Sequence, residues 1–169
     1  MQRVTEPLRD EHKELFPHVE ALREAGDVLS GSDDAAVKQK VSEAYSFLAD
    51  HLIPHAVAEE KALYPVVGQT MGSDMATRTM SRDHVEVGRL TERLQRSRQL
   101  METTPLDEAS RNELRQVLYG LYSVVKVHFA KEEEVYLPLL DEKLTESEAK
   151  RMFEAMESVA AAEKSSRGH

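Results

Sequence analysis

The sequence predicts an all-α protein: an antiparallel up-down-up-down four-helix bundle with a short additional C-terminal helix. Helix-favouring residues dominate, with only 7 Gly and 6 Pro among 169 residues, and alternating β-branched runs are scarce. Four long segments carry apolar residues at three- and four-residue spacings, and short connections join them. The length suits one domain, residues 1–164, and we expect residues 165–169 to be a disordered tail.

The composition excludes several classes of protein and of metal site. With 31 acidic and 22 basic residues, the net charge of −9 disfavours binding to nucleic acid or to anionic lipid. No apolar run approaches the roughly 20 residues of a membrane-spanning helix, and the N-terminus lacks the apolar stretch of a secretion signal. We therefore expect a soluble, cytoplasmic protein without a membrane partner. Because there is no Cys, a strongly bound metal must be held by His and carboxylate groups.

The first helix is predicted to begin after Thr5, with Pro7 in its first turn, where the missing N–H costs nothing. Pro17 lies in the interior and should kink the helix or shift its beginning. The apolar stripe along this helix includes one histidine and consists of Leu8, His12, Leu15, Val19, Leu22 and Leu29.

The second helix is predicted to begin at Ser32 or Asp33, which are good N-caps, and to run to about Tyr64, ending near Pro65 and Gly68. Pro54 removes a backbone donor within this helix, so we expect a local bend there. The predicted buried line contains two histidines and one glutamate and consists of Val41, Ala44, Leu48, His51, His55, Glu59 and Ala62.

Ser73 is the expected cap of a third helix, and Thr104 followed by Pro105 predicts the start of a fourth that breaks at Pro138. The buried side of the third helix is Met80, His84, Val87, Thr91 and Leu94. The stripe of the fourth is Leu114, Val117, Leu121, Val124, His128, Glu132, Val135 and Leu139. Thr145 and Glu148 then have the spacing of a capping box, which predicts a short fifth helix.

A repeated frame carries the chemistry. HAVAEEKALYP, beginning at His55, returns 73 residues later as HFAKEEEVYLP, beginning at His128, and both read His, three residues, Glu-Glu, four residues, Pro. On a helix the His and the first Glu, four residues apart, lie on one face. Each copy follows another histidine, His12 or His84, at a nearly constant distance.

Two copies of this unit supply four imidazoles and two carboxylates. That set suits a first-row transition metal better than calcium or magnesium, which prefer oxygen ligands. A single buried histidine or a single His-x3-Glu pair is more often structural, but six such residues on apolar seams point to a metal that compensates the buried charge. The predicted metal ligands are His12, His55, Glu59, His84, His128 and Glu132.

Four further residues near these ligands have open roles. His51 can be a fifth histidine ligand or can orient a ligand through a hydrogen bond. Tyr136 can donate to or ligate a metal, or can pack in the core with its hydroxyl hydrogen-bonded. Glu60 and Glu133 follow the ligating glutamates but are rotated about 100° off the seam, so we expect them to be solvated or paired with Lys or Arg.

The segments LRDEHKEL, HAVAEEKALYP, SRDHVEV and HFAKEEEVYLP resemble the hemerythrin-like, or HHE cation-binding, family over nearly the whole chain. The resemblance implies a four-helix bundle around two iron ions, bridged by two carboxylates and an oxo or hydroxo group, with the six residues above as ligands. The third helix here offers only His84, with Met80 one turn earlier. The pattern is therefore closer to the bacterial proteins of the family than to the oxygen-carrying hemerythrins of marine invertebrates.

The resemblance suggests a di-iron protein that binds or reacts with O2, NO or H2O2. Peroxide breakdown or NO reduction would be the enzymatic form, although no substrate-pocket motif supports it. The alternative is iron sensing, storage or delivery, including iron-sulfur cluster repair. Zinc fits less well, because it usually takes four ligands and two symmetric triplets suit two metals better. The sequence does not identify a protein partner or an oligomeric state.

Overall fold

Helices account for nearly all of residues 3–167, the part of the chain that the computed structural model describes, and no strand occurs in that range. Helix α1 spans Glu6–Asp27, and a 3-10 turn, η1, follows at Val28–Ser30. The all-α prediction is confirmed. Pro7 lies in the first turn of α1, and the helix continues through Pro17, so this proline does not shift its beginning.

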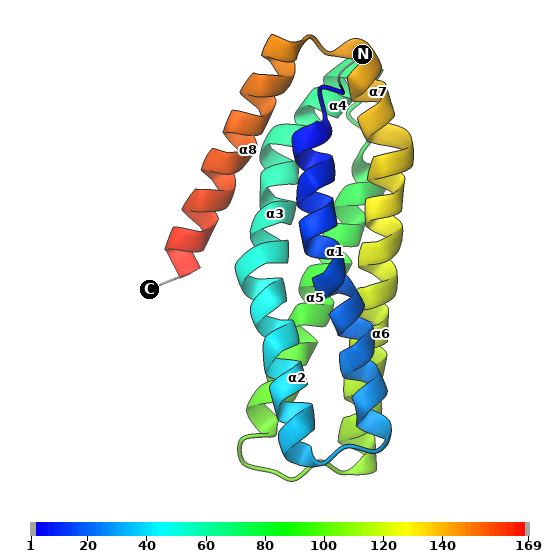
Figure 1. Cartoon of the computed structure of the whole chain (residues 1–169), viewed down its shortest axis with the longest axis vertical. Coiled ribbons are helices and arrows are strands. Elements are labelled where there is room, and N and C mark those ends of the chain that lie inside the picture. The colour runs from blue at the N-terminus through cyan, green and yellow to red at the C-terminus, as the bar shows by residue number, and fades with distance from the viewer. Residues whose placement is uncertain (1–2, 168–169) are drawn as a thin grey trace.

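The second rod is one long run of helix in which two π-helical turns interrupt the α-helix. Its segments are α2 (Asp34–Phe47), η2 (Leu48–Leu52), α3 (Ile53–Ala58), η3 (Glu59–Leu63) and α4 (Tyr64–Met71). The remaining segments are α5 (Arg78–Leu100), α6 (Glu108–Lys131), the π turn η4 (Glu132–Tyr136), α7 (Leu137–Lys143) and α8 (Glu146–Arg167). Figure 1 shows α1, the second rod, α5 and the α6–α7 rod side by side along the long axis, with α8 against the outside of α3.

Three predicted helix starts are confirmed and two are wrong, and the first of the three is the start of α1 directly after Thr5. The Asp33 side chain accepts a hydrogen bond from the Ala36 N–H at 2.8 Å, and Thr145 and Glu148 form the predicted capping box. The third helix begins at Arg78 rather than after Ser73, beyond a series of turns. The fourth begins at Glu108 because Asp107, and not Thr104, caps it by accepting from the Ser110 N–H at 2.8 Å.

Each π turn begins six residues before a proline: Leu48 before Pro54, Glu59 before Pro65 and Glu132 before Pro138. In an α-helix the proline ring would press on the carbonyl four residues back and leave it without a donor. The wider turn accommodates the ring, and π turns of this kind are frequent at functional sites. Two of the three begin at the predicted glutamate ligands.

The accommodated prolines explain why two predicted helix ends are wrong. The second rod passes Pro65 and ends at Met71, where Gly72 takes the left-handed conformation with φ 68° that favours glycine. The fourth rod likewise passes Pro138 and continues to Lys143.

Helix α8 is longer than the predicted short fifth helix and extends to Arg167. Residues 165–167 therefore form its last turn instead of the predicted disordered tail, because helix-compatible residues continue the helix beyond residue 164. Residues 168–169 lie outside the described range. No described helix is both long and apolar enough to cross a membrane.

Buried apolar residues form two separate clusters along the bundle. The first cluster includes Leu15, Leu22, Val125 and Phe129. The second includes Leu8, Leu137 and, from α8, Met156. On every rod one predicted ligand falls between members of the two clusters in sequence: His12, His55, His84 and Glu132. A polar layer thus separates two apolar cores.

Candidate metal centre

The six predicted ligands meet in this polar layer. Glu59 and Glu132 have no exposed surface, and His12, His55 and His128 are about 95% buried. His84 is slightly more accessible, with 12% of its side chain exposed. The ligand atoms fall into two groups, each compact enough to hold one metal ion.

The first group joins α1, the second rod and the start of η4. His55 Nε2 lies 2.7 Å from Glu59 Oε1, and His12 Nε2 lies 3.1 Å from Glu132 Oε2. All four donor atoms lie within 4.8 Å of one another. Metal–ligand bonds of about 2.1 Å at right angles place neighbouring donors about 3 Å apart, so these spacings suit one ion.

The second group consists of His84, His128 and the other oxygen of Glu59, and the other oxygen of Glu132 lies beside it. His84 Nε2 lies 3.0 Å from Glu59 Oε2 and 3.1 Å from His128 Nε2. His128 Nε2 also lies 3.3 Å from Glu132 Oε1. Glu59 therefore belongs to both groups, with one oxygen in each. Glu132 directs one oxygen to the first group, and its other oxygen lies near His128 of the second.

The pattern of missing hydrogen bonds agrees with a metal in the first group. Five buried side-chain atoms among residues 3–167 make no hydrogen bond of acceptable geometry. Four of them are the donors of this group, which lie in His–Glu ion-pair contact only: His12 Nε2, His55 Nε2, Glu59 Oε1 and Glu132 Oε2. Buried polar atoms are rarely left unpaired in proteins, because each one costs free energy. A bound cation would satisfy all four at once.

Each ligand histidine is oriented by its own carboxylate at the other ring nitrogen. His12 Nδ1 lies 2.7 Å from Glu133, and His84 Nδ1 lies 2.7 Å from Glu60. An Nδ1–H that donates to a carboxylate leaves Nε2 free as a metal ligand and raises its basicity.

The other two histidines are oriented in the same way. His55 Nδ1 lies 2.9 Å from Glu11, and His128 Nδ1 lies 3.0 Å from Asp83, which also pairs with Lys131. The four carboxylates come from acidic residues directly adjacent in sequence to a predicted ligand. The signal in the sequence is a pair of adjacent residues at each place: Glu11–His12, Glu59–Glu60, Asp83–His84 and Glu132–Glu133.

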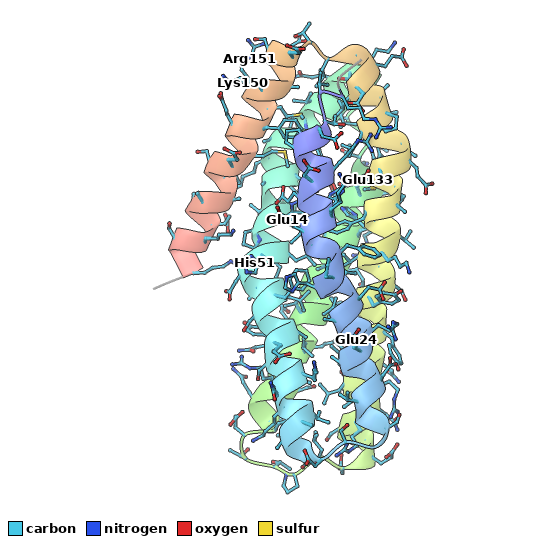
Figure 2. All side chains as sticks on the ribbon, in the orientation of Figure 1. Glu14, Glu24, His51, Glu133, Lys150 and Arg151 are labelled. Atoms are coloured by element: carbon cyan, nitrogen blue, oxygen red, sulfur yellow. The ribbon has the colours of Figure 1, made fainter. Side chains whose placement is uncertain are left out.

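The prediction for Glu60 and Glu133 missed their main contact. Glu133 does pair with an arginine, Arg9, at 2.5 Å, but it also holds His12, and it lies between α1 and the α6–α7 rod in Figure 2. Glu60 accepts from Ser81 at 2.9 Å as well as from His84. The 100° rotation off the seam aims each glutamate at the neighbouring helix rather than at solvent.

The buried charges shift the pKa values of the ligands in opposite directions. Burial by itself would lower the pKa of His128, but hydrogen bonds and charge from Glu132 and Glu59 outweigh it and raise the pKa to about 10. Burial is likewise overcome at His12 by Glu132 and at His55 by Glu59 and Glu11, so both pKa values are raised. Burial would raise the pKa of Glu59, yet the surrounding histidines hold it well below its usual range.

His51 does not reach the cluster, so its predicted position on the buried line is wrong. Its side chain is exposed on the outer surface of the second rod (Figure 2). The π turn Leu48–Leu52 adds a residue to the helix at this point, and Leu52 takes the buried position instead. Tyr136 packs in the core and donates to the Ala76 carbonyl at 2.8 Å, which is the second of its two predicted roles.

Tyr64 is not among the predicted site residues, but its hydroxyl lies in the second group. Tyr64 is five residues after Glu59, and the π turn between them rotates it toward the glutamate. Burial and the negative charges of Glu59 and Glu132 raise the pKa of Tyr64, so its hydroxyl is protonated in the metal-free protein and donates to Glu132. The available signal was a tyrosine in both copies of the frame.

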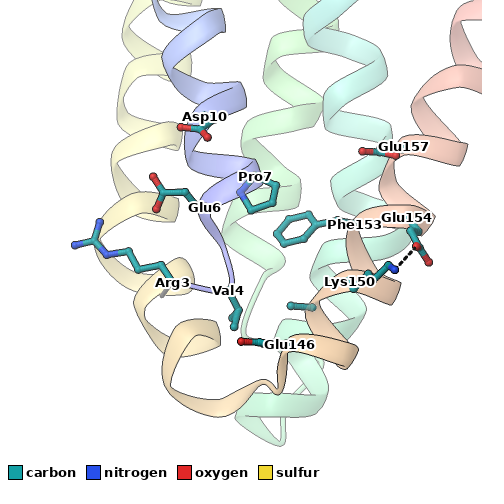
Figure 3. Close-up of a pocket in the computed structure, with 11 residues that line it drawn as sticks. Arg3, Val4, Glu6, Pro7, Asp10, Glu146, Lys150, Phe153, Glu154 and Glu157 are labelled. Atoms are coloured by element: carbon teal, nitrogen blue, oxygen red, sulfur yellow. Dashed lines mark ion pairs between the residues drawn. The ribbon is translucent and has the colours of Figure 1, made fainter. Parts of the chain in front are cut away.

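Two adjoining grooves lie between the beginning of α1 and α8. One, of about 760 Å³, is lined by residues that include Pro7, Asp10 and Phe153, and Figure 3 shows Phe153 pointing toward Pro7. The other, of about 470 Å³, shares these residues and extends to His55. The grooves thus approach the cluster from the Glu11 side of His55, while the ligand atoms themselves stay enclosed.

The chain matches the model of one known protein family. The family model of the hemerythrin HHE cation binding domain matches residues 3–140. The chain belongs to this family. The matched range contains the six residues predicted as ligands and excludes α8, and the match together with the buried His/Glu cluster indicates a metal-binding helical protein. Comparisons with curated proteins and with solved structures gave no match.

Metal loading of this HHE domain should release protons. His128, with a pKa of about 10, carries a proton at neutral pH, whereas a metal ligand must be a neutral imidazole. At pH values below this raised pKa, the apparent affinity for the metal should therefore fall about tenfold for each unit by which the pH is lowered, for each proton displaced. Calorimetry of Fe²⁺ binding at pH 7, without oxygen and in two buffers of different ionisation enthalpy, should give at least one proton per chain. A release of zero would contradict the raised pKa.

Removing the charge at Glu133 should weaken metal binding without unfolding the domain. The Glu133→Gln side chain has the same size but holds His12 less strongly, and loss of such a partner typically costs about 10–100-fold in metal affinity. Glu134→Gln is the matched control, since Glu134 is the exposed next residue and carries the same charge. Chelator competition for Fe²⁺ measures both variants, and equal affinities would show that Glu133 does not support the site.

Proposed function

We propose that the protein holds two iron ions, one in each group, and binds or reacts with a small ligand such as O2, NO or H2O2. The observation that supports it is the division of Glu59 and Glu132, each with one oxygen toward His12 and His55 and the other toward His84 and His128. Two histidines plus carboxylate oxygen with open positions is a ligand set typical of non-haem iron. Bound iron would supply redox chemistry and a place for the ligand, with an oxo or hydroxo group as a further bridge.

The enclosure of the cluster favours a very small partner. The six ligands are almost completely buried, and Phe129 stacks on His12 with ring centroids 4.4 Å apart. A diatomic molecule or peroxide can enter such a space through small side-chain motions, whereas a larger substrate requires an open cleft at the metal.

The proposal also includes an antiparallel up-down-up-down order of the four helical rods. The connections at alternate ends of the bundle in Figure 1 support this order.

Metal analysis combined with an optical spectrum tests the proposal. Protein from iron-replete cells should contain two irons per chain and show near-ultraviolet oxo-to-iron bands that change on addition of azide, peroxide or NO. Two zinc ions and no such bands would contradict it. The same spectra on a His84→Ala, His128→Ala double variant should show one iron at most, since only the first group stays complete.

Iron sensing, storage or delivery is the second candidate, and one observation favours it. The ligand layer lies between the two apolar clusters, so loss of metal leaves buried charges in the middle of the bundle. The stability of the folded bundle then depends on how much of the site is occupied by metal. An iron sensor requires such a dependence.

Removing iron should lower the melting temperature strongly if this second function holds. A ligand present at 1,000 times its Kd stabilises by about 4 kcal/mol, and each kcal/mol raises the Tm of a chain this long by about 2–4 °C. Calorimetric scans of the iron-loaded and metal-free protein should therefore differ by at least about 8 °C. A smaller difference would argue that occupancy does not control the fold.

A further inference from the structure

Tyr64 is the first residue of α4 and lies directly after the π turn that begins at Glu59. Only 4% of its surface is exposed, and its hydroxyl points into the second ligand group. The hydroxyl oxygen lies 3.1 Å from Glu132 Oε1, 3.2 Å from His128 Nε2, and 3.4 Å from both His84 Nε2 and Glu59 Oε2. It is close to every donor of that group.

These distances are those expected between neighbouring ligands of one ion. Donors at right angles around a metal, with bonds of about 2.1 Å, are about 3 Å apart. The Tyr64 oxygen satisfies this spacing toward four atoms at once, as one vertex of an octahedron does toward its four neighbours. The histidine pair of the same group, His84 and His128, has its Nε2 atoms 3.1 Å apart, which is the same spacing.

The first group has no equivalent. In the repeated frame Leu137 occupies the position that corresponds to Tyr64, and it is completely buried without a donor atom. The ring next to the first group is Phe129, which stacks on His12 and also has no donor. The pseudo-symmetric site therefore has five protein donors on one side and four on the other.

We infer that Tyr64 is the fifth protein ligand of the metal ion held by His84 and His128. The inference rests on the proposed di-iron function. A bond forms between the phenolate oxygen and the metal, and the hydroxyl proton leaves to solvent, so no electron is transferred in this step. With a bridging oxygen as sixth ligand that ion is saturated, and the small ligand binds to the ion of His12 and His55, which keeps one open position.

Optical and vibrational spectra of the ferric protein test the inference independently of activity. Phenolate bound to ferric iron gives a visible charge-transfer band, at longer wavelength than the oxo-to-iron bands, and resonance Raman excitation in it enhances tyrosine ring modes. These modes should shift when the protein is produced with ring-deuterated tyrosine. This measurement uses the unmodified chain, so it needs no variant to fold.

Two matched variants identify the tyrosine. Tyr64→Phe should lose the visible band while it retains two irons and the near-ultraviolet bands. Tyr136→Phe removes the other tyrosine of the repeated frame, whose hydroxyl donates to the Ala76 backbone, and should retain the band. Azide should bind one per chain in the unmodified protein and two in Tyr64→Phe, because the lost ligand opens a second position.

The outcomes separate this inference from the function on which it rests. Two irons with near-ultraviolet bands but without tyrosine-enhanced modes would overturn the Tyr64 ligand and leave the di-iron proposal standing. The same holds if Tyr64→Phe retains the visible band. Protein that takes up no iron would overturn both.

Discussion

The burial of two carboxylates in the middle of the bundle is the constraint on which the rest of the structure depends. Glu59 and Glu132 are fully enclosed, and an ionised carboxylate taken out of water costs several kcal/mol unless positive charge and hydrogen bonds compensate it. Four imidazoles face these carboxylates, and a second ring of carboxylates holds the imidazoles from behind. The result is a charged layer between two apolar cores that becomes fully satisfied when cations occupy it.

The π turns connect the backbone to this site. Pro65 and Pro138 each follow a buried glutamate of the cluster by six residues, and the widened turn that accommodates the ring also rotates the residues beyond it. One rod thereby places Tyr64 at the cluster, whereas Leu137, at the corresponding position of the other rod, is buried in the second apolar core. A small difference between two copies of one motif thus produces two chemically different halves of one centre.

Helix α8 adds a further feature to the matched HHE domain. It packs against α3 and η3, beside the grooves that extend to His55, and buries Met152 and Met156. It therefore forms one wall of the groove that reaches His55. The family match ends at residue 140, so this wall is specific to the C-terminal part of the chain.

The sequence by itself determined the helical class, the single long match to the HHE family and the six residues that meet, because helical periodicity and a repeated spacing are local properties. The tertiary structure decided which neighbours serve those six. It turned His51 outward, brought Tyr64 inward and paired each histidine with an acid from another helix. The physical reason is that a π turn changes the facing of all later residues, and contacts between helices depend on that facing rather than on distance along the chain.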